Sequence, residues 1–319
     1  MRTPLLSVNR RVRPVSEPRP RTRHGDNMLA AGIMVLSMAS FVVNDTAIKM
    51  VTQTLPLSEA IALRGLVVTV LLWTIAQRDG GVVWWPAAPR DRLMLALRTV
   101  AEVSSTLLYL LALQFMSIGE LSAIMQALPL AVMLAAALVF RERLGWRRLS
   151  AVGVGFLGVL LILRPGTGAF DAAAVLALAS VLLIVVRDLA SRSFTPAIRS
   201  STIAFYAALS VMLAAPLVGG LGDWHWPTAS ELLGLSVSTA FLAIGYLTAV
   251  AVMRVGEVGF VSPFRYVSLI SAGTLGFFIF GERPDAWTLA GGLLILAAGL
   301  YTILRQAALD RALRRGEAS

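Results

Sequence analysis

The sequence contains no cysteine, which excludes disulfide bonds, thiolate metal ligands and a cysteine nucleophile. Histidine occurs only as His24, near the N-terminus, and as His225, in an expected loop. Little imidazole is therefore available for acid–base catalysis or metal binding. We expect no catalytic residue, no metal site and no cofactor site, and hence a protein that is not an enzyme.

Charged residues are also scarce, at 14% of 319 residues, whereas 57% of the residues are hydrophobic. A soluble domain of this length needs about 25% charged residues to keep its surface in water. Most of the surface is therefore expected to face lipid, and the bilayer is the first partner that the composition predicts.

The chain is basic, with 28 lysines and arginines, 18 acidic residues and a formal net charge of +10. The arginines cluster between apolar segments, as orientation signals do in membrane proteins, so no nucleic-acid partner is expected. Residues 1–27 hold seven arginines, four prolines and two acidic residues. This composition predicts a disordered basic tail on the cytoplasmic side that touches anionic lipid.

A transmembrane helix needs about 20 mostly apolar residues. Ten segments approach this length, and the short connections between them favour a compact bundle. They cover residues 28–50, 57–77, 93–115, 118–140, 148–164, 170–190, 199–219, 230–252, 256–280 and 286–305. The predicted fold class is an all-α membrane protein with ten transmembrane helices, followed by a cytoplasmic tail at residues 306–319.

Arginine and lysine are distributed unevenly between alternate connections. One set of connections, together with both termini, holds most of them, whereas the other set holds Lys49, Arg164 and Arg283. Basic connections stay in the cytoplasm. We therefore predict a multi-pass protein of the cell inner (plasma) membrane with both termini cytoplasmic.

The sequence also repeats itself. Residues 107–120 and 244–257, separated by an offset of 137, are identical at six of fourteen positions. We interpret residues 28–164 and 165–305 as two repeats of five helices each. Because five is an odd number, the second repeat must lie upside down relative to the first. Inverted repeats are the geometry of many alternating-access carriers.

Two matching turns give the sequence a family resemblance. Phe280-Gly281-Glu282 ends the ninth segment and Phe140-Arg141-Glu142 ends the fourth. With ten segments in two halves, the chain resembles the EamA family of the drug/metabolite transporter superfamily over roughly residues 28–305. The family often has Leu-Gly-Glu where this chain has Phe140-Arg141-Glu142, so that turn departs from the pattern. The resemblance implies a central cavity lined by helices 1–4 and 6–9, with helices 5 and 10 at the periphery.

Three short patterns narrow this resemblance. Asn44-Asp45-x-x-x-Lys49, Leu63-Arg64-Gly65 and Phe264-Arg265-Tyr266 are similar to patterns in the group of bacterial riboflavin and S-adenosylmethionine carriers. The resemblance implies a small organic substrate that is cofactor-like, nucleoside-like or amino-acid-like.

Charged and polar side chains inside apolar segments mark the candidate substrate site, because a lone charge in the bilayer is strongly unfavourable. Arginines suit a carboxylate or phosphate group, and tyrosine rings suit a flat substrate. Gln126 and Pro129 correspond to the neighbourhood of Arg265 in the other half, and a proline can kink the helix there. The candidate substrate-binding residues are Asp45, Arg64, Arg98, Glu102, Tyr109, Gln126, Tyr246, Arg265 and Tyr266.

Each of these residues also has a structural interpretation. Charged residues can pair with each other and hold helices together, and those four positions apart lie on the same helix face. The pairs of this kind are Arg98 with Glu102, Asp45 with Lys49, and Arg187 with Asp188. The tyrosines can pack in the core or anchor the protein at the membrane surface, and Pro129 can be a structural kink only.

The remaining motifs have mainly structural interpretations. Gly153, Gly155 and Gly158 fit the G-x-G-x-x-G dinucleotide fingerprint, but they lie inside an apolar helix, where small residues permit close packing. The acidic residues at helix starts are interpreted as caps, and those at helix ends as parts of turns. These residues are Glu120 and Glu257 at helix starts, and Glu142 and Glu282 at helix ends.

The leading prediction is a secondary-active transporter of a small organic metabolite that works by alternating access, as a monomer or homodimer. Asp45 and Glu102 are candidate sites for proton or ion coupling. The alternatives are an intramembrane enzyme acting on a lipid-linked substrate and a non-transporting membrane scaffold. The substrate, the coupling ion and the choice between import and export are not determined by the sequence.

Overall fold

The computed structural model describes residues 24–140, 146–164, 172–195, 198–255 and 261–314, and every element in these ranges is helical. The elements are α1 (His24–Val51), α2 (Leu57–Arg78), α3 (Pro89–Phe115), α4 (Ile118–Met125), α5 (Leu128–Phe140), α6 (Trp146–Leu163), α7 (Ala172–Arg192), α8 (Ser200–Ala214), η1 (Ala215–Val218), α9 (Ala229–Val255), η2 (Ser262–Tyr266), α11 (Val267–Phe280) and α12 (Ala286–Arg314). Of the expected basic tail, residues 1–23 lie outside the described ranges.

Among the described residues, eight helical spans are long and apolar enough to cross a membrane. They are Met28–Val51, Leu57–Arg78, Pro89–Phe115, Ile118–Val139, Ala172–Ser191, Ser200–Val218, Ala229–Ala249 and Ala286–Arg305. The expected spans 148–164 and 256–280 are represented by shorter apolar helices, Leu149–Leu163 and Phe264–Phe280. The all-helical membrane architecture is confirmed at this level, and the count of ten spans stays a prediction.

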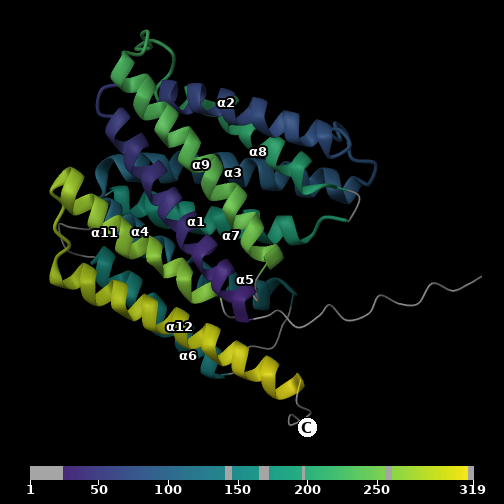
Figure 1. The fold of residues 1–319 in the computed structure, drawn as a ribbon, viewed down its shortest axis with the longest axis vertical. Coiled ribbons are helices and arrows are strands. Elements are labelled where there is room, and N and C mark those ends of the chain that lie inside the picture. The colour runs from purple at the N-terminus through teal and green to yellow at the C-terminus, as the bar shows by residue number, and fades with distance from the viewer. Residues whose placement is uncertain (1–23, 141–145, 165–171, 196–197, 256–260, 315–319) are drawn as a thin grey trace, which may run out of the picture.

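The helices pack in pairs that join the two halves of the chain. The most extensive contacts are those of α1 with α9, α3 with α7, α6 with α12 and α2 with α8, and α11 packs against both α1 and α4. In Figure 1, α1 lies along α9 through the middle of the molecule, and α12 lies along α6 at one edge. Each pair takes one helix from each half of the sequence, so the halves interleave in one bundle.

Large apolar side chains cover much of the outside of this bundle. Leu217, Phe278 and Leu138 are each about three-quarters exposed. Their exposure in a water-soluble protein would be unfavourable, whereas lipid solvates them. The buried core between the helices is built from leucine, isoleucine, valine and alanine.

Glycines allow α6 and α12 to approach closely. A Cβ atom added to Gly158 would lie 2.6 Å from the carbonyl oxygen of Gly291, and one added to Gly291 would lie 2.5 Å from that of Gly158. A Cβ atom on Gly155 would collide with Leu130. The packing interpretation of the G-x-G-x-x-G motif is confirmed at Gly155 and Gly158.

Two alanine substitutions on α6 test this contact. Gly158→Ala should lower the thermal unfolding midpoint in detergent, because overpacking should reduce the free energy of unfolding by about 1–3 kcal/mol. Gly153→Ala is the matched control, because a Cβ atom at Gly153 would meet nothing within 4 Å. Alanine should leave stability there unchanged or raise it by up to about 1 kcal/mol, since it favours helix. Equal effects of the two substitutions would contradict the role given to Gly158.

Candidate functional site

Two helices are interrupted where the candidate site lies. The expected span 118–140 is not one continuous helix, because α4 ends at Met125 and α5 begins at Leu128. Pro129 lacks the N–H group that would continue the α-helical hydrogen-bond pattern, which explains a break at this point. In the other half, the 3₁₀ helix η2 precedes α11 and carries Arg265 and Tyr266. The helix is therefore interrupted beside the proline that can kink it, and the role of this interruption in substrate binding stays a prediction.

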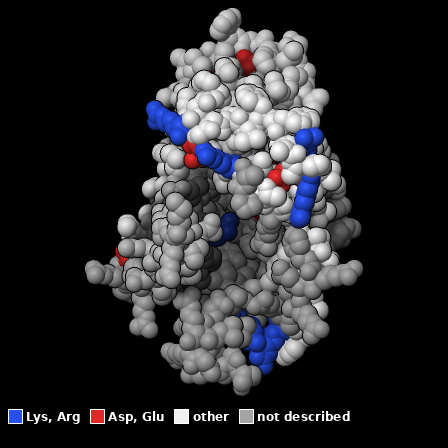
Figure 2. Space-filling view, turned by 90° about the vertical axis from the view of Figure 1, so that its right-hand side faces the viewer, with Lys and Arg blue, Asp and Glu red and all other residues white. Residues whose placement is uncertain are grey.

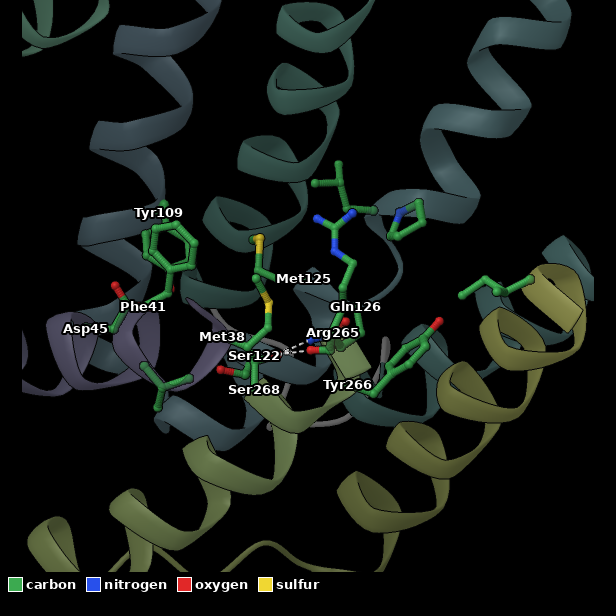
Figure 3. Close-up of a pocket in the computed structure, with 14 residues that line it drawn as sticks. Met38, Phe41, Asp45, Tyr109, Ser122, Met125, Gln126, Arg265, Tyr266 and Ser268 are labelled. Atoms are coloured by element: carbon green, nitrogen blue, oxygen red, sulfur yellow. Dashed lines mark hydrogen bonds between the residues drawn. The ribbon is translucent and has the colours of Figure 1, made fainter. Parts of the chain in front are cut away.

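A cavity of about 230 Å³ lies beside both interruptions. Figure 3 shows its walls, which come from α1, α3, α4, α5, η2, α11 and α12. Five of the nine candidate residues line it, namely Asp45, Tyr109, Gln126, Arg265 and Tyr266. The complete lining is Met38, Phe41, Val42, Asp45, Tyr109, Ser122, Met125, Gln126, Leu128, Pro129, Arg265, Tyr266, Ser268 and Ile303.

Asp45 lines one side of this cavity, and two neutral donors hold its carboxylate. The Tyr109 hydroxyl donates to Oδ2 at 2.6 Å, and the Asn44 amide nitrogen donates to Oδ1 at 3.0 Å. Among the described residues, no lysine, arginine or histidine forms an ion pair with Asp45. The carboxylate therefore reaches the cavity with its orientation fixed and its charge not neutralised by a direct partner.

Asn44 connects Asp45 to two further helices. Its side-chain oxygen accepts hydrogen bonds from Arg64 Nη1 at 3.2 Å and from the Ser238 hydroxyl at 2.8 Å. Arg64 lies on α2 and is buried, so it supports the site through Asn44 and does not line the cavity. Sequence reasoning missed the role of Asn44, although the Asn44-Asp45 pattern had drawn attention to the position.

Arg265 lines the opposite side of the cavity. Its guanidinium group forms no hydrogen bond or ion pair with any other described residue, and its side chain is exposed. The backbone below it is held in place, because Gln126 donates to the Ser268 hydroxyl, which donates to the Arg265 carbonyl oxygen at 2.9 Å. The interrupted helices of the two halves therefore meet through Gln126 and Ser268.

Tyr266 stands beside Arg265 with its ring largely buried, at 7% exposure. A Cβ atom added to Gly299 of α12 would lie 1.5 Å from the Tyr266 hydroxyl oxygen. The absence of a side chain at Gly299 therefore creates the space that the Tyr266 hydroxyl occupies. The ring forms part of the cavity wall and its hydroxyl points toward α12 (Figure 3).

Arg98 and Glu102 belong to a separate ionic cluster between α3 and α7. Arg98 Nη2 lies 3.2 Å from Glu102 Oε2, and Arg187 Nη1 lies 3.4 Å from Glu102 Oε1. Arg187 also pairs with Asp188 at 2.9 Å. The expected pairing of these residues is confirmed. They do not line the described cavity, so their contact with substrate stays a prediction.

Tyr246 contacts the cavity wall and does not line the cavity itself. Its ring meets Phe41 edge to face, with the two ring centroids 5.5 Å apart. Phe41 lines the cavity on α1, so Tyr246 supports this wall from α9. A direct contact of Tyr246 with substrate stays a prediction.

The predicted pairing of Lys49 with Asp45 is wrong, because Lys49 pairs with Glu282. Lys49 Nζ lies 2.7 Å from Glu282 Oε1 and also donates to the Met116 carbonyl oxygen at 2.6 Å. The second carboxylate oxygen of Glu282 accepts a hydrogen bond from the Ile118 N–H at 2.9 Å. The carboxylate that satisfies Lys49 thus comes from the other half of the chain, which spacing along one helix does not reveal.

The interpretations of the other acidic residues have mixed outcomes. Ser117 and Glu120 form a reciprocal capping box at the start of α4, which confirms Glu120 as a cap. Glu282 follows Gly281, whose φ of 68° ends α11 in the left-handed region, so Glu282 is part of a turn as well as an ion pair. Glu142 and Glu257 lie outside the described residues. Within the described ranges, no group of three or more acidic or histidine side chains could hold a metal ion.

Replacing Asn44 tests its connecting role. Asn44→Ala removes one donor to Asp45 and leaves Arg64 and Ser238 without their shared acceptor. We expect the free energy of unfolding, measured by thermal unfolding, to fall by about 3 kcal/mol, because unpaired buried polar groups are unfavourable. Ser238→Ala removes one hydrogen bond only and should lower stability by about 1 kcal/mol. A larger effect of Ser238→Ala than of Asn44→Ala would contradict this arrangement.

Comparison with known proteins identifies related sequences. Residues 28–164 match the EamA-like transporter family. The chain is 26% identical over 181 residues to the S-adenosylmethionine uptake transporter of Rickettsia prowazekii (strain Madrid E), covering 56% of this chain and 60% of that protein. It is 25% identical over 277 residues to the pseudopaline exporter CntI of Pseudomonas aeruginosa (strain UCBPP-PA14), covering 85% and 95%. It is 30% identical over 203 residues to the riboflavin transporter of Rhizobium johnstonii, covering 61% and 64%.

These alignments span less than two thirds of the Rickettsia and Rhizobium proteins and nearly all of the Pseudomonas protein. A solved crystal structure has a similar fold, with a TM-score of 0.60 and 16% sequence identity, and the match covers 87% of this chain and 98% of that one. The chain is therefore a multi-pass membrane protein whose residues 28–164 are similar to the EamA-like transporter family.

Proposed function

We propose that the protein is a secondary-active carrier that moves a small organic metabolite across the inner membrane by alternating access of two inverted five-helix repeats. The observation that carries this proposal is the cavity, which is lined by interrupted helices from both halves. Carriers commonly place their substrate site between repeats, at discontinuous helices. The three relatives are named for the uptake, export or transport of small metabolites, which supports the same class of activity here.

The pairing of helices supports the inverted repeat. If α1, α2, α3, α4–α5 and α6 correspond to α7, α8, α9, η2–α11 and α12, exchanging the halves converts the α1–α9 contact into the α7–α3 contact. The α2–α8, α6–α12 and α4–α11 contacts each convert into themselves. All of these pairs are in contact. This is the pattern that a two-fold axis between the repeats would produce.

The basic connections indicate how the carrier is oriented. The connection between α2 and α3 runs from Arg78, the last residue of α2, to the start of α3, whose first turn holds Arg90 and Arg92, and it lies on the right in Figure 1. By the distribution of basic residues, this side is the cytoplasmic one. Figure 2 views the molecule from this side and shows a hollow with a basic side chain inside.

At the opposite end, the proposed gate is the Lys49–Glu282 ion pair, which lies beyond the residues that line the cavity. Lys49 follows Asp45 by four residues on α1, and Ser122 follows Ile118 by four residues on α4. One helical turn, about 5.4 Å, therefore separates the ion pair and its hydrogen bonds from the cavity lining on both helices. The contacts join α1, the end of α3, α4 and the end of α11. Opening this end requires these elements to separate and the ion pair to break.

Accessibility of a cavity residue tests this mechanism. The chain lacks cysteine, so Met125→Cys provides a single reactive thiol in the cavity wall. In vesicles of defined orientation, a membrane-impermeant maleimide should label it mainly from the cytoplasmic side. Adding Glu282→Gln should increase labelling from the opposite side. Both side chains of the ion pair are at most 16% exposed. Removing one partner of such a pair destabilises the closed conformation of this end by about 3 kcal/mol, which shifts the equilibrium toward the open conformation roughly a hundredfold.

Two controls make this experiment specific. Arg164→Ala removes an ion pair with Asp285 at the same end, between α6 and α12, and should leave the labelling unchanged. The exchange Lys49→Glu with Glu282→Lys restores opposite charges but loses the hydrogen bonds with the Met116 carbonyl and the Ile118 N–H, so it should return labelling only part of the way toward the starting pattern. Labelling from one side only in every variant would contradict alternating access around this cavity.

A further inference from the structure

Only two of the described residues that line the cavity carry a charge, and their charges are opposite. Asp45 on α1 supplies a carboxylate and Arg265 on η2 supplies a guanidinium group. The remaining lining residues are neutral, and most are apolar. The cavity therefore has one negative and one positive pole in a mostly apolar wall.

The positive pole lacks a partner within the described protein. Arg265 forms no ion pair, although Gln126 and Ser268 fix the backbone that carries it. A ligand that fills the cavity removes water from this guanidinium, which is unfavourable unless the ligand supplies an anionic group. The planar guanidinium matches a carboxylate through two parallel hydrogen bonds.

The negative pole also keeps capacity for a ligand. A carboxylate offers about four lone-pair positions, and Asp45 uses one for Tyr109 and one for Asn44. Both donors are neutral. Arg64 donates its hydrogen bond to the Asn44 amide oxygen and not to the Asp45 carboxylate. Asp45 is therefore oriented to accept a hydrogen bond from a cationic group or to attract its charge.

The two poles face each other across the cavity. Figure 3 shows Asp45 and Tyr109 on one side and Arg265 and Tyr266 on the other, with Met38 and Met125 between them. A single ligand that meets both poles needs its two charges on different parts of the molecule. The thioether side chains between the poles suit an apolar or aromatic central part.

We infer that the substrate of the proposed carrier is an organic zwitterion with an anionic group, such as a carboxylate, bound at Arg265 and a separate cationic group bound at Asp45. This inference rests on the proposed function, because it treats the cavity as the transport site. An uncharged ligand would leave both poles without partners, and a purely anionic one would lie close to the Asp45 carboxylate.

Three probes that differ by one charged group test the inference. S-adenosylmethionine has a carboxylate, an ammonium group on the same carbon, and a sulfonium cation two methylene groups away. S-adenosylhomocysteine lacks only the sulfonium charge, and decarboxylated S-adenosylmethionine lacks only the carboxylate. Because the ammonium group of the first two probes stays beside the carboxylate, the sulfonium is the separate cation that the comparison tests. Binding is measured by isothermal titration calorimetry with the purified full chain, and riboflavin serves as the uncharged probe. We expect the first probe to bind about tenfold or more tightly than each of the other three, because two of them lose one charge contact and riboflavin loses both.

Two variants assign the poles. Arg265→Gln should remove the preference for S-adenosylmethionine over its decarboxylated form and keep its preference over S-adenosylhomocysteine. Asp45→Asn should have the reverse effect. Both keep similar shapes, and circular dichroism checks that they fold. Retention of both preferences in both variants would overturn the assignment, as would tighter binding of riboflavin or failure of all four probes to bind. These outcomes leave the maleimide-labelling result unaffected, so failure of the inference is distinguishable from failure of the proposed function.

Discussion

A charge inside an apolar helical bundle must pair or face water, and this constraint organises the structure. Lys49 meets Glu282, and Glu102 meets Arg187, so these two ion pairs hold helices from different halves together. Arg98 pairs with Glu102 within α3. Asp45 and Arg265 have no such ion pair among the described residues, and both line the cavity. The unpaired charges therefore coincide with the place where a ligand has access, which is where unpaired charges can persist.

The general architecture could be predicted from the sequence because it depends on local properties. An apolar segment about 20 residues long predicts a membrane-spanning helix by itself. The interruption near Pro129 follows from the missing N–H group of proline. Five of the nine candidate residues line one cavity. They could be identified from the sequence because charged, aromatic and amide side chains are uncommon within such apolar segments. Rarity was a sufficient signal for Asp45, Tyr109 and Arg265.

The partners of these residues could not be predicted, because they depend on how distant segments pack. Sequence spacing suggested Asp45 for Lys49, but Glu282 lies 233 positions away and reaches Lys49 only in the folded bundle. Asn44 was noted only as part of the Asn44-Asp45 pattern and was given no role of its own, because its hydrogen-bond partners lie on other helices. Its importance comes from accepting hydrogen bonds from α2 and α9 while donating to Asp45.

In the proposed transport cycle, the end held together by the Lys49–Glu282 ion pair opens. Spin labels on cysteines at Met50 and Phe278, which are both at least half exposed near the ends of α1 and α11, would report this motion by electron–electron double resonance in nanodiscs. We predict two distance populations, with the longer one increased by Glu282→Gln. A single distance that is the same with and without this substitution would contradict the claim.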